Sequence, residues 1–169
     1  VLQFTVTIVI LMGTIVVNRQ LDYMQKKDPG FAKENLLLIH RSDVLEGGID
    51  AFKEQVLQHA NVIAVANTNV IPSRAYSDNA HWLEGWDRSE IFTLSTSRVS
   101  YDFEKAMGLE MASGRFFSRE MPSDSFAVVV NEAAVRALGL EEPLTNRFVD
   151  IDQNGEVDRF IPIIGVVKD

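Results

Sequence analysis

The chain has 169 residues, 46% of them hydrophobic and 24% charged, with a formal net charge of −8. A chain of this length has room for one or two small domains, and its acidity argues against nucleic acid or an anionic membrane surface as the main partner. It contains no cysteine, which excludes disulfides, thiolate zinc sites and a cysteine nucleophile.

The N-terminal stretch Val1–Val17 (VLQFTVTIVILMGTIVV) is apolar and carries no charge. As a helix it would span roughly 25 Å, a little less than the roughly 30 Å hydrocarbon core of a bilayer. It lacks the basic start and the cleavage site of a signal peptide. We therefore predict a transmembrane helix whose cytoplasmic start lies before Val1. The alternative is a buried helix, which needs a larger core than the remaining residues can supply.

The helix is predicted to continue through residues 18–27 as a stalk, because Val17, Leu21 and Met24 repeat at helical spacing on one face. Asp28-Pro29-Gly30 should end it, since proline disfavours a helical residue before it and glycine leaves a helix easily. The stalk would extend about 15 Å beyond the membrane. A short juxtamembrane helix without a mechanical role is the alternative.

The first half of the remaining chain predicts a β-α-β unit. Asn35–His40 (NLLLIH) is a short apolar run typical of a buried strand, and Ile49–Ala60 has the apolar face of an amphipathic helix. Val62–Asn69 reads as the returning strand, so the crossover should be right-handed if the two strands are parallel.

The middle of the chain predicts a loop, a hairpin and a short helix. Ile71–Ala80 is rich in turn residues, and His81–Asp87 and Ile91–Val99 alternate as two paired strands would. Tyr101–Met107 is predicted to be a helix that ends at Gly108.

The last third repeats the order of strand and helix and then adds a hairpin. Phe126–Val130 is a buried strand candidate, and the helix after it has Asn131 as N-cap and Gly139 as its stop. Arg147–Ile151 and Phe160–Val167 read as strands joined across Asn154-Gly155. Together the elements predict an α+β or mixed α/β domain, which is incomplete if the chain continues beyond residue 169.

No constellation of catalytic or metal-binding residues stands out. His40, His59 and His81 lack metal-ligand spacing, and there is no nucleophile elbow or phosphate loop. Residues 150–155 match the opening of a calcium loop, but the position of the bidentate glutamate holds Ile161. An acidic hairpin explains this segment better, and we predict no cofactor, no metal and no catalytic residue.

Three aromatic residues form the one candidate ligand or partner surface. Trp82 and Trp86 stand four residues apart, with Tyr76 upstream, and could line a groove. Core packing or a loop lid is the alternative, and such aromatics serve these purposes more often than ligand binding.

Several short motifs follow one another along the chain in a recognisable order. They are Lys27-Asp28-Pro29-Gly30-Phe31, Glu34–Ile39, Val99–Phe103, Met107–Glu110, Gly114–Phe117, Ala127–Ala134, Leu138–Leu140, Pro143-Leu144 and Ile164–Asp169. This order resembles the MacB-like periplasmic core domain of FtsX/MacB-type ABC-transporter permeases. The resemblance covers nearly the whole chain, and its most specific block begins at Gly114-Arg115. After Pro143-Leu144 the family usually has Gly-Lys, and this chain has Thr145-Asn146.

The resemblance implies a non-catalytic permease subunit in the bacterial inner membrane. It predicts residues 1–17 as the membrane helix, 18–30 as stalk and hinge, and 31–169 as a periplasmic domain with a βαβ-rich and a β-rich lobe. Two permease copies, or one copy and a related permease, would pair. Cytoplasmic ATPase subunits would bind below, and the stalk would transmit their work to the periplasm, to envelope proteins among other targets. The expected coupling residues are Leu21, Tyr23, Met24, Asp28, Pro29 and Gly30.

A second hypothesis is the extracytoplasmic sensor domain of a membrane signalling receptor, which also joins a membrane helix to an αβ domain. The gene beyond residue 169 separates the two hypotheses. A permease should continue with three more transmembrane helices, and a sensor should continue with one, followed by a cytoplasmic signalling module.

Overall fold

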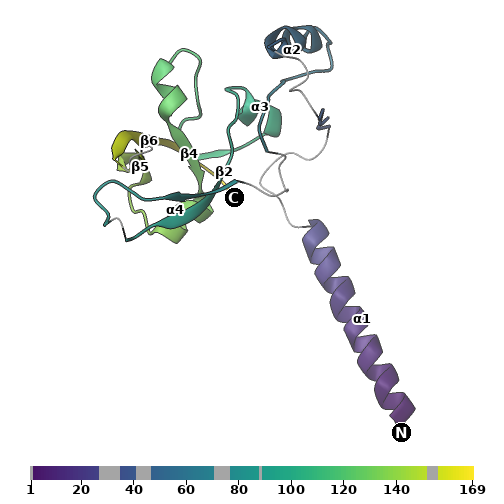
Figure 1. The fold of residues 1–169 in the computed structure, drawn as a ribbon. Helices are drawn as coiled ribbons and strands as arrows, with labels where there is room; N and C mark the ends of the chain where they lie inside the picture. Colours follow the sequence, from purple (N-terminus) through teal and green to yellow (C-terminus); the bar gives the residue numbers. More distant parts are fainter. Residues whose placement is uncertain (1, 27–34, 41–46, 71–76, 88, 152–155) are drawn as a thin grey trace.

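The computed structural model describes residues 2–26, 35–40, 47–70, 77–87, 89–151 and 156–169. Within these ranges a long N-terminal helix precedes a mixed domain of short helices and strands, which confirms the predicted fold class (Figure 1). The helices are α1 (Leu2–Lys26), α2 (Ile49–Leu57), α3 (Phe103–Met107), α4 (Glu132–Leu138) and the 3-10 helices η2 (Pro122–Phe126) and η3 (Pro143–Thr145). The strands are β1 (Ser77–His81), β2 (Phe92–Thr96), β3 (Met111–Gly114), β4 (Val128–Asn131), β5 (Arg147–Ile151) and β6 (Val157–Val167).

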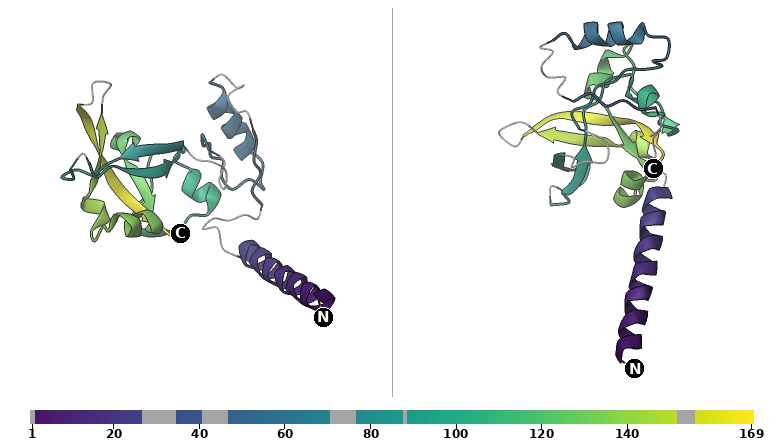
Figure 2. Two further views of the ribbon diagram at one scale, coloured as in Figure 1. Left: turned by 60° about the horizontal axis from the view of Figure 1, so that its bottom comes forward. Right: turned by 90° about the vertical axis from the view of Figure 1, so that its right-hand side faces the viewer.

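Helix α1 projects away from the mixed domain (Figures 1 and 2). By length and composition, Leu2–Met24 could cross a membrane, and none of this segment is buried against the rest of the chain. The hydroxyls of Thr7 and Thr14 each donate to the carbonyl four residues earlier, so both are satisfied within the helix. One helix thus joins the apolar leader to the stalk, as predicted. The predicted hinge Asp28-Pro29-Gly30 lies outside the described residues.

Strand β6 organises the larger sheet, because its two halves pair with different partners. Its first half pairs antiparallel with β5, from Arg147↔Pro162 to Ile151↔Val157. Its second half lies between β3, which is antiparallel, and β4, which is parallel. The long strand is visible in yellow in the second view of Figure 2. The predicted strands at 147–151 and 160–167 are confirmed, and the turn at residues 154–155 lies outside the described residues.

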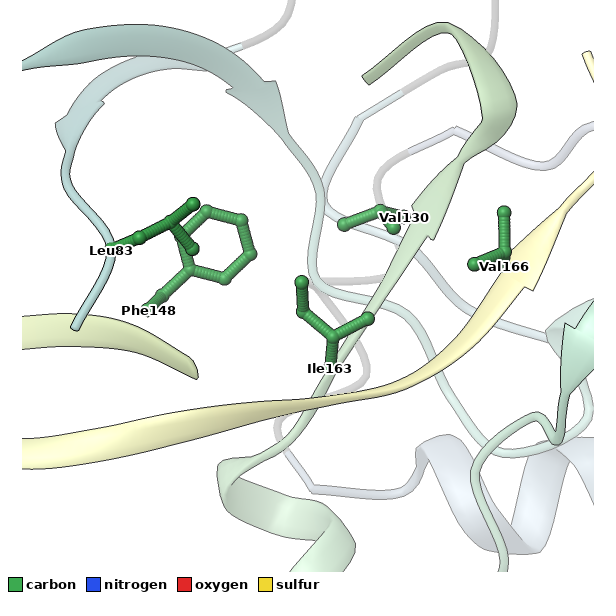
Figure 3. Close-up of a cluster of buried hydrophobic side chains, with 5 residues drawn as sticks. All are labelled: Leu83, Val130, Phe148, Ile163 and Val166. Atoms are coloured by element: carbon green, nitrogen blue, oxygen red, sulfur yellow. The ribbon is translucent and has the colours of Figure 1, made fainter. Parts of the chain in front are cut away.

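The core gathers around β6. Ile163 is 1% exposed and packs with four other buried side chains from β4, β5, β6 and the segment after β1 (Figure 3). Helix α4 adds the half-buried Ala134, Val135 and Leu138 to this cluster. The other buried members are Leu83, Val130, Phe148 and Val166.

Replacing Ile163 by valine should lower the free energy of unfolding by about 1 kcal/mol, because one buried methyl group is removed from a closed core. Ile91→Val is the matched control, since Ile91 is 54% exposed and should change stability by less than about 0.5 kcal/mol. Chemical denaturation of the full chain in detergent micelles measures both. Equal effects of the two variants would contradict the burial of Ile163.

Helices α3 and α4 have the caps that the sequence predicts. The Asn131 side chain accepts a hydrogen bond from the Ala134 amide at the start of α4. Gly108 and Gly139 both end their helices in the left-handed conformation, with φ of 64°. These three predictions are confirmed. They could be made from the sequence because capping depends on residues within one turn of the helix end.

The smaller sheet contains β1 and β2, which pair antiparallel from Ser77↔Thr96 to His81↔Phe92. The sequence predicts a hairpin here, but it places the first strand at 81–87 and a loop at 77–80. The structure shows that this placement is wrong, because β1 spans Ser77–His81. The polar sequence of β1 shows no alternation, and the ladder to β2 determines its conformation. After His81 the chain crosses to β5, where Leu83 forms an isolated bridge with Phe148.

The predicted β-α-β unit is not formed in the described part of the chain. Helix α2 is present, but residues 35–40 and 62–67 have no strand ladder there, and Leu37 is 83% exposed. Of the described residues in this predicted unit, only Thr68 forms an isolated bridge, and its partner is Val99. An apolar run becomes a buried strand only where a partner edge and a covering layer are available. Neither is present beside residues 35–40 within the described ranges.

Candidate functional site

The predicted coupling surface lies on the C-terminal part of α1. Leu21, Tyr23 and Met24 are all exposed. Tyr23 and Met24 line a shallow open depression, together with Val16, Arg19 and Gln20 from the preceding turns. The depression runs along one side of a single helix, where residues three and four apart are neighbours. The surface could therefore receive another helix, although its role in coupling stays a prediction.

The predicted aromatic surface divides between core and backbone contacts. The Trp86 indole packs edge-on against Phe92 at a centroid distance of 5.7 Å and lies against the buried core. The Trp82 carbonyl accepts a hydrogen bond from the Val149 amide at 3.0 Å, which fixes this segment to β5. Tyr76 lies outside the described residues. Trp86 thus has a packing role, and a ligand role for the three aromatics stays a prediction.

Gly114 and Arg115 lie where the end of β3 comes into close contact with its partner strand β6. Gly114 has a φ of 69° and lies opposite Gly165 in the β3–β6 ladder. The next amide, of Arg115, donates to the Ile164 carbonyl at 3.0 Å. A side chain on Gly114 would meet the backbone of β6, and a side chain on Gly165 would meet the backbone of Arg115, directly after β3. Two glycines therefore allow the strands to cross in close contact.

The Arg115 side chain forms a two-pronged ion pair with Asp124. Its guanidinium donates to both carboxylate oxygens, at 2.5 and 2.7 Å. One of these oxygens also accepts from the Ser118 amide at 2.8 Å. The Asp124 side chain is 1% exposed, and these hydrogen bonds, led by those from Arg115, lower its pKa below the ordinary value. The pair closes the segment between β3 and η2 into a fixed loop.

A second cluster of charges fixes the end of β6. The Asp169 carboxylate accepts from the Asn131 side chain at 3.0 Å and from the Ala133 amide at 2.7 Å, and it also pairs with Arg136. Lys168 donates to Glu110 at 2.7 Å, and this hydrogen bond raises the pKa of Lys168. The residues that follow β6 are thus hydrogen-bonded to the end of β4, to α4 and to the residue before β3.

Two solved structures resemble this arrangement in fold. A domain of a putative permease protein from Porphyromonas gingivalis superposes with a TM-score of 0.50 and 19% identity, over 69% of this chain and 44% of that one. This chain shares the fold of that permease domain. The periplasmic region of MacB from Actinobacillus actinomycetemcomitans gives a TM-score of 0.47 and 19% identity, over 71% of this chain and 50% of that one.

The chain thus spans about half the length of the solved domains that it matches. No protein-family model and no curated protein matches the sequence. The likeness to the permease domain therefore concerns the fold, and some of the later sequence motifs quoted above lie where this fold packs closely or caps a helix. Gly114-Arg115 and Asn131 are the clearest examples, because one makes the crossing of β6 and the other caps α4.

The described residues of this permease-domain fold contain no group of three or more His, Asp or Glu side chains that could hold a metal. Of the acidic hairpin, Asp150 lies 3.6 Å from Arg159, and Asp158 pairs with the same Arg159 at 2.6 Å. The rest of the candidate calcium loop, at residues 152–155, lies outside the described ranges.

The sequence gives no signal for Asp124, and it offers His81 only as one of three histidines without metal-ligand spacing. Asp124 lies in a stretch of polar residues that reads as an ordinary surface loop, and only the folded chain brings it to Arg115. His81 stands alone in the sequence, and its contacts come from strands β2 and β5. Neither residue has a local sequence signal, because the contacts of His81 come from distant strands and the Arg115–Asp124 pair has no regular spacing.

Proposed function

We propose that this chain is part of an ABC-transporter permease subunit, with α1 in the bacterial inner membrane and the mixed domain in the periplasm. The domain would couple ATP hydrolysis by partner ATPase subunits to export or to another event in the cell envelope. The chain itself would be non-catalytic. The observation that carries the proposal is a single apolar-to-polar helix, α1, that precedes a domain with the permease-domain fold.

The composition of α1 changes along its length in a way that supports this function. Its first part is apolar on all sides, and charged residues begin at Arg19 and Asp22. Backbone groups inside a helix satisfy one another, so such a segment can cross a bilayer and continue into water without a break. A helix that continues in this way can pass a tilt or a shift to the domain beyond it. A flexible linker of the same length would absorb such movements.

The expected partners follow from this position. A cytoplasmic ABC ATPase subunit would act from below the membrane, and a second permease copy or a related permease would lie beside the first. The exposed face of α1 around Tyr23 and Met24 supports helix pairing as the mode of contact. Envelope proteins are candidate partners of the acidic periplasmic domain.

Interrupting the stalk with a flexible segment should uncouple the two ends of the permease. We would insert seven Gly/Ser residues after Met24 of the full-length permease and reconstitute it with its neighbouring ATPase in lipid nanodiscs. Basal ATP hydrolysis should persist, while the response of hydrolysis to added envelope extract should be lost. The matched control inserts seven helix-forming residues, which add about 10 Å and preserve the helix face to about 20°.

The helical insertion should retain most of the response, since it keeps the stalk rigid. Equal responses of the flexible and helical variants would exclude a mechanical role for the stalk. Failure of any ATPase to associate with the full-length protein would exclude the transporter and favour the receptor sensor domain.

A further inference from the structure

His81 occupies the junction between the two sheets. At the end of β1 it pairs with Phe92 of β2, and its imidazole lies 6.4 Å from the Phe92 ring and 5.7 Å from the Phe148 ring of β5. Directly after His81, residues 82–84 join β5 through backbone hydrogen bonds from Glu84 to Arg147 and from Val149 to Trp82. We call residues 82–84 and 147–149 the sheet junction.

The Nε2 atom of His81 is buried and has no hydrogen-bond partner among the described residues. A neutral imidazole can leave one nitrogen without a partner at moderate cost, whereas an imidazolium has two N–H donors and a charge to satisfy. The two aromatic rings beside His81 offer no hydrogen-bond acceptor of the usual kind. The site therefore accommodates the neutral form better than the charged one.

The charges around His81 are few. From β2, the facing residues Phe92 and Leu94 are apolar, and the segment after β1 contributes Leu83 to the same core. From β5, Phe148 contacts the imidazole, and Asp150 is the one described charge that acts on it. Asp150 is itself 3.6 Å from Arg159 of β6, which reduces its effect on His81. Of the described groups, only Asp150 favours the imidazolium.

We propose that His81 is an acid-sensitive element that holds the β1–β2 sheet against β5 while it is neutral and releases that sheet when it is protonated. The released part would be the small sheet together with the sheet junction, and the β3–β6–β4 sheet would stay intact. Since this proposal concerns the chain alone, it is independent of any ATPase partner. Its failure would leave the proposed transport function untouched.

The direction of the pH effect follows from the partial burial of the imidazole. Burial lowers the pKa of His81 below its ordinary value of 6.5, and the smaller opposing effect of Asp150 does not reverse this. The closed junction therefore binds fewer protons than the open one. The contact is fully stabilised above pH 6.5 and weakens as the pH falls from there toward the lowered pKa. Opening takes up one proton at His81 in this interval. The equilibrium between the closed and the open junction therefore changes by up to about tenfold per pH unit between 6.5 and the lowered pKa.

Hydrogen exchange on the full chain in detergent micelles tests the proposal. After correction for intrinsic exchange rates, the junction amides of Glu84 and Val149 should lose protection between pH 7.5 and pH 5, by up to about tenfold per unit between 6.5 and the lowered pKa of His81. The amides between β4 and β6 should keep theirs. His81→Gln should remove this pH dependence, because its amide gains no charge in this range. His59→Gln, at an exposed position after α2, is the matched control and should leave it unchanged.

An NMR titration of the His81 ring in the unmodified chain gives a second measurement that does not depend on a variant that folds. Its pKa should lie below 6.5, and Asp150→Asn should lower it further by removing the charge that favours the imidazolium. The proposal is overturned if His81 titrates at or above 6.5. It is also overturned if junction protection is the same at both pH values, or if His81→Gln keeps the pH dependence of the unmodified chain.

Discussion

Gly165→Ala should lower the free energy of unfolding by about 3 kcal/mol or more, because the added methyl group would be forced against backbone in the centre of the larger sheet. Its Cβ would collide with the Arg115 carbonyl oxygen and would lie 2.6 Å from the Met111 Cε and 3.0 Å from the Arg115 carbonyl carbon. Met111 could move aside, but the backbone of Arg115 is held by its hydrogen bond to Ile164. Chemical denaturation of the full chain in detergent micelles measures the loss.

Two other glycines separate crowding from backbone strain. Gly139→Ala places a side chain at a φ of 64° in open space, so only the left-handed conformation is penalised, by about 1 kcal/mol. Gly114→Ala combines a φ of 69° with collision against the Ile164 carbonyl, and it should cost at least as much as Gly165→Ala. If Gly165→Ala is no more costly than Gly139→Ala, β3 and β6 do not cross as closely as the structure has them.

The parts of the fold that the sequence predicts correctly are those with local causes. Helix α4 has its N-cap at Asn131 and its stop at Gly139, both within one turn of its ends. Strands β5 and β6 combine β-branched residues with a short connection, so their pairing requires only a local turn. Helix α1 needs no tertiary contact to form, because its length and composition suffice.

The parts that the sequence misplaces depend on partners that are distant along the chain. The run at 35–40 looks like a strand, but in the described residues no edge pairs with it. Strand β1 looks like a loop, but β2 supplies its ladder. Local composition cannot show which of these two segments forms a strand, because the stability of a strand depends on its neighbours as much as on its own residues.

The candidate sites divide in the same way. The apolar stripe of Leu21 and Met24 on the stalk could be predicted from helical spacing alone. The environment of His81 could not be predicted, since Phe92 and Phe148 reach it from two other strands. The Arg115–Asp124 pair lies between these cases, because it spans a short loop but has no regular spacing.

Asp124→Asn should lower the free energy of unfolding at neutral pH by about 3 kcal/mol, because it leaves the Arg115 guanidinium without its carboxylate. This is the lower end of the range for buried pairs, since the Arg115 side chain is 40% exposed and stays partly solvated. Asp102→Asn is the matched control. Asp102 pairs with Arg119 at 2.8 Å, but both side chains are exposed, so its loss should cost much less than the loss of Asp124.

The pH dependence of the Asp124→Asn effect distinguishes loss of the charge from a general packing defect. The pKa of Asp124 is lowered in the folded chain from its ordinary value of 3.8, so the folded state binds fewer protons at this carboxyl than the unfolded state. The stabilisation is complete above pH 3.8 and is lost as the pH falls through the lowered pKa. The difference between the unmodified chain and Asp124→Asn should therefore shrink as the pH is lowered below 3.8. A difference that stays constant down to the lowest pH at which both chains fold would mean that the carboxylate charge does not stabilise this loop.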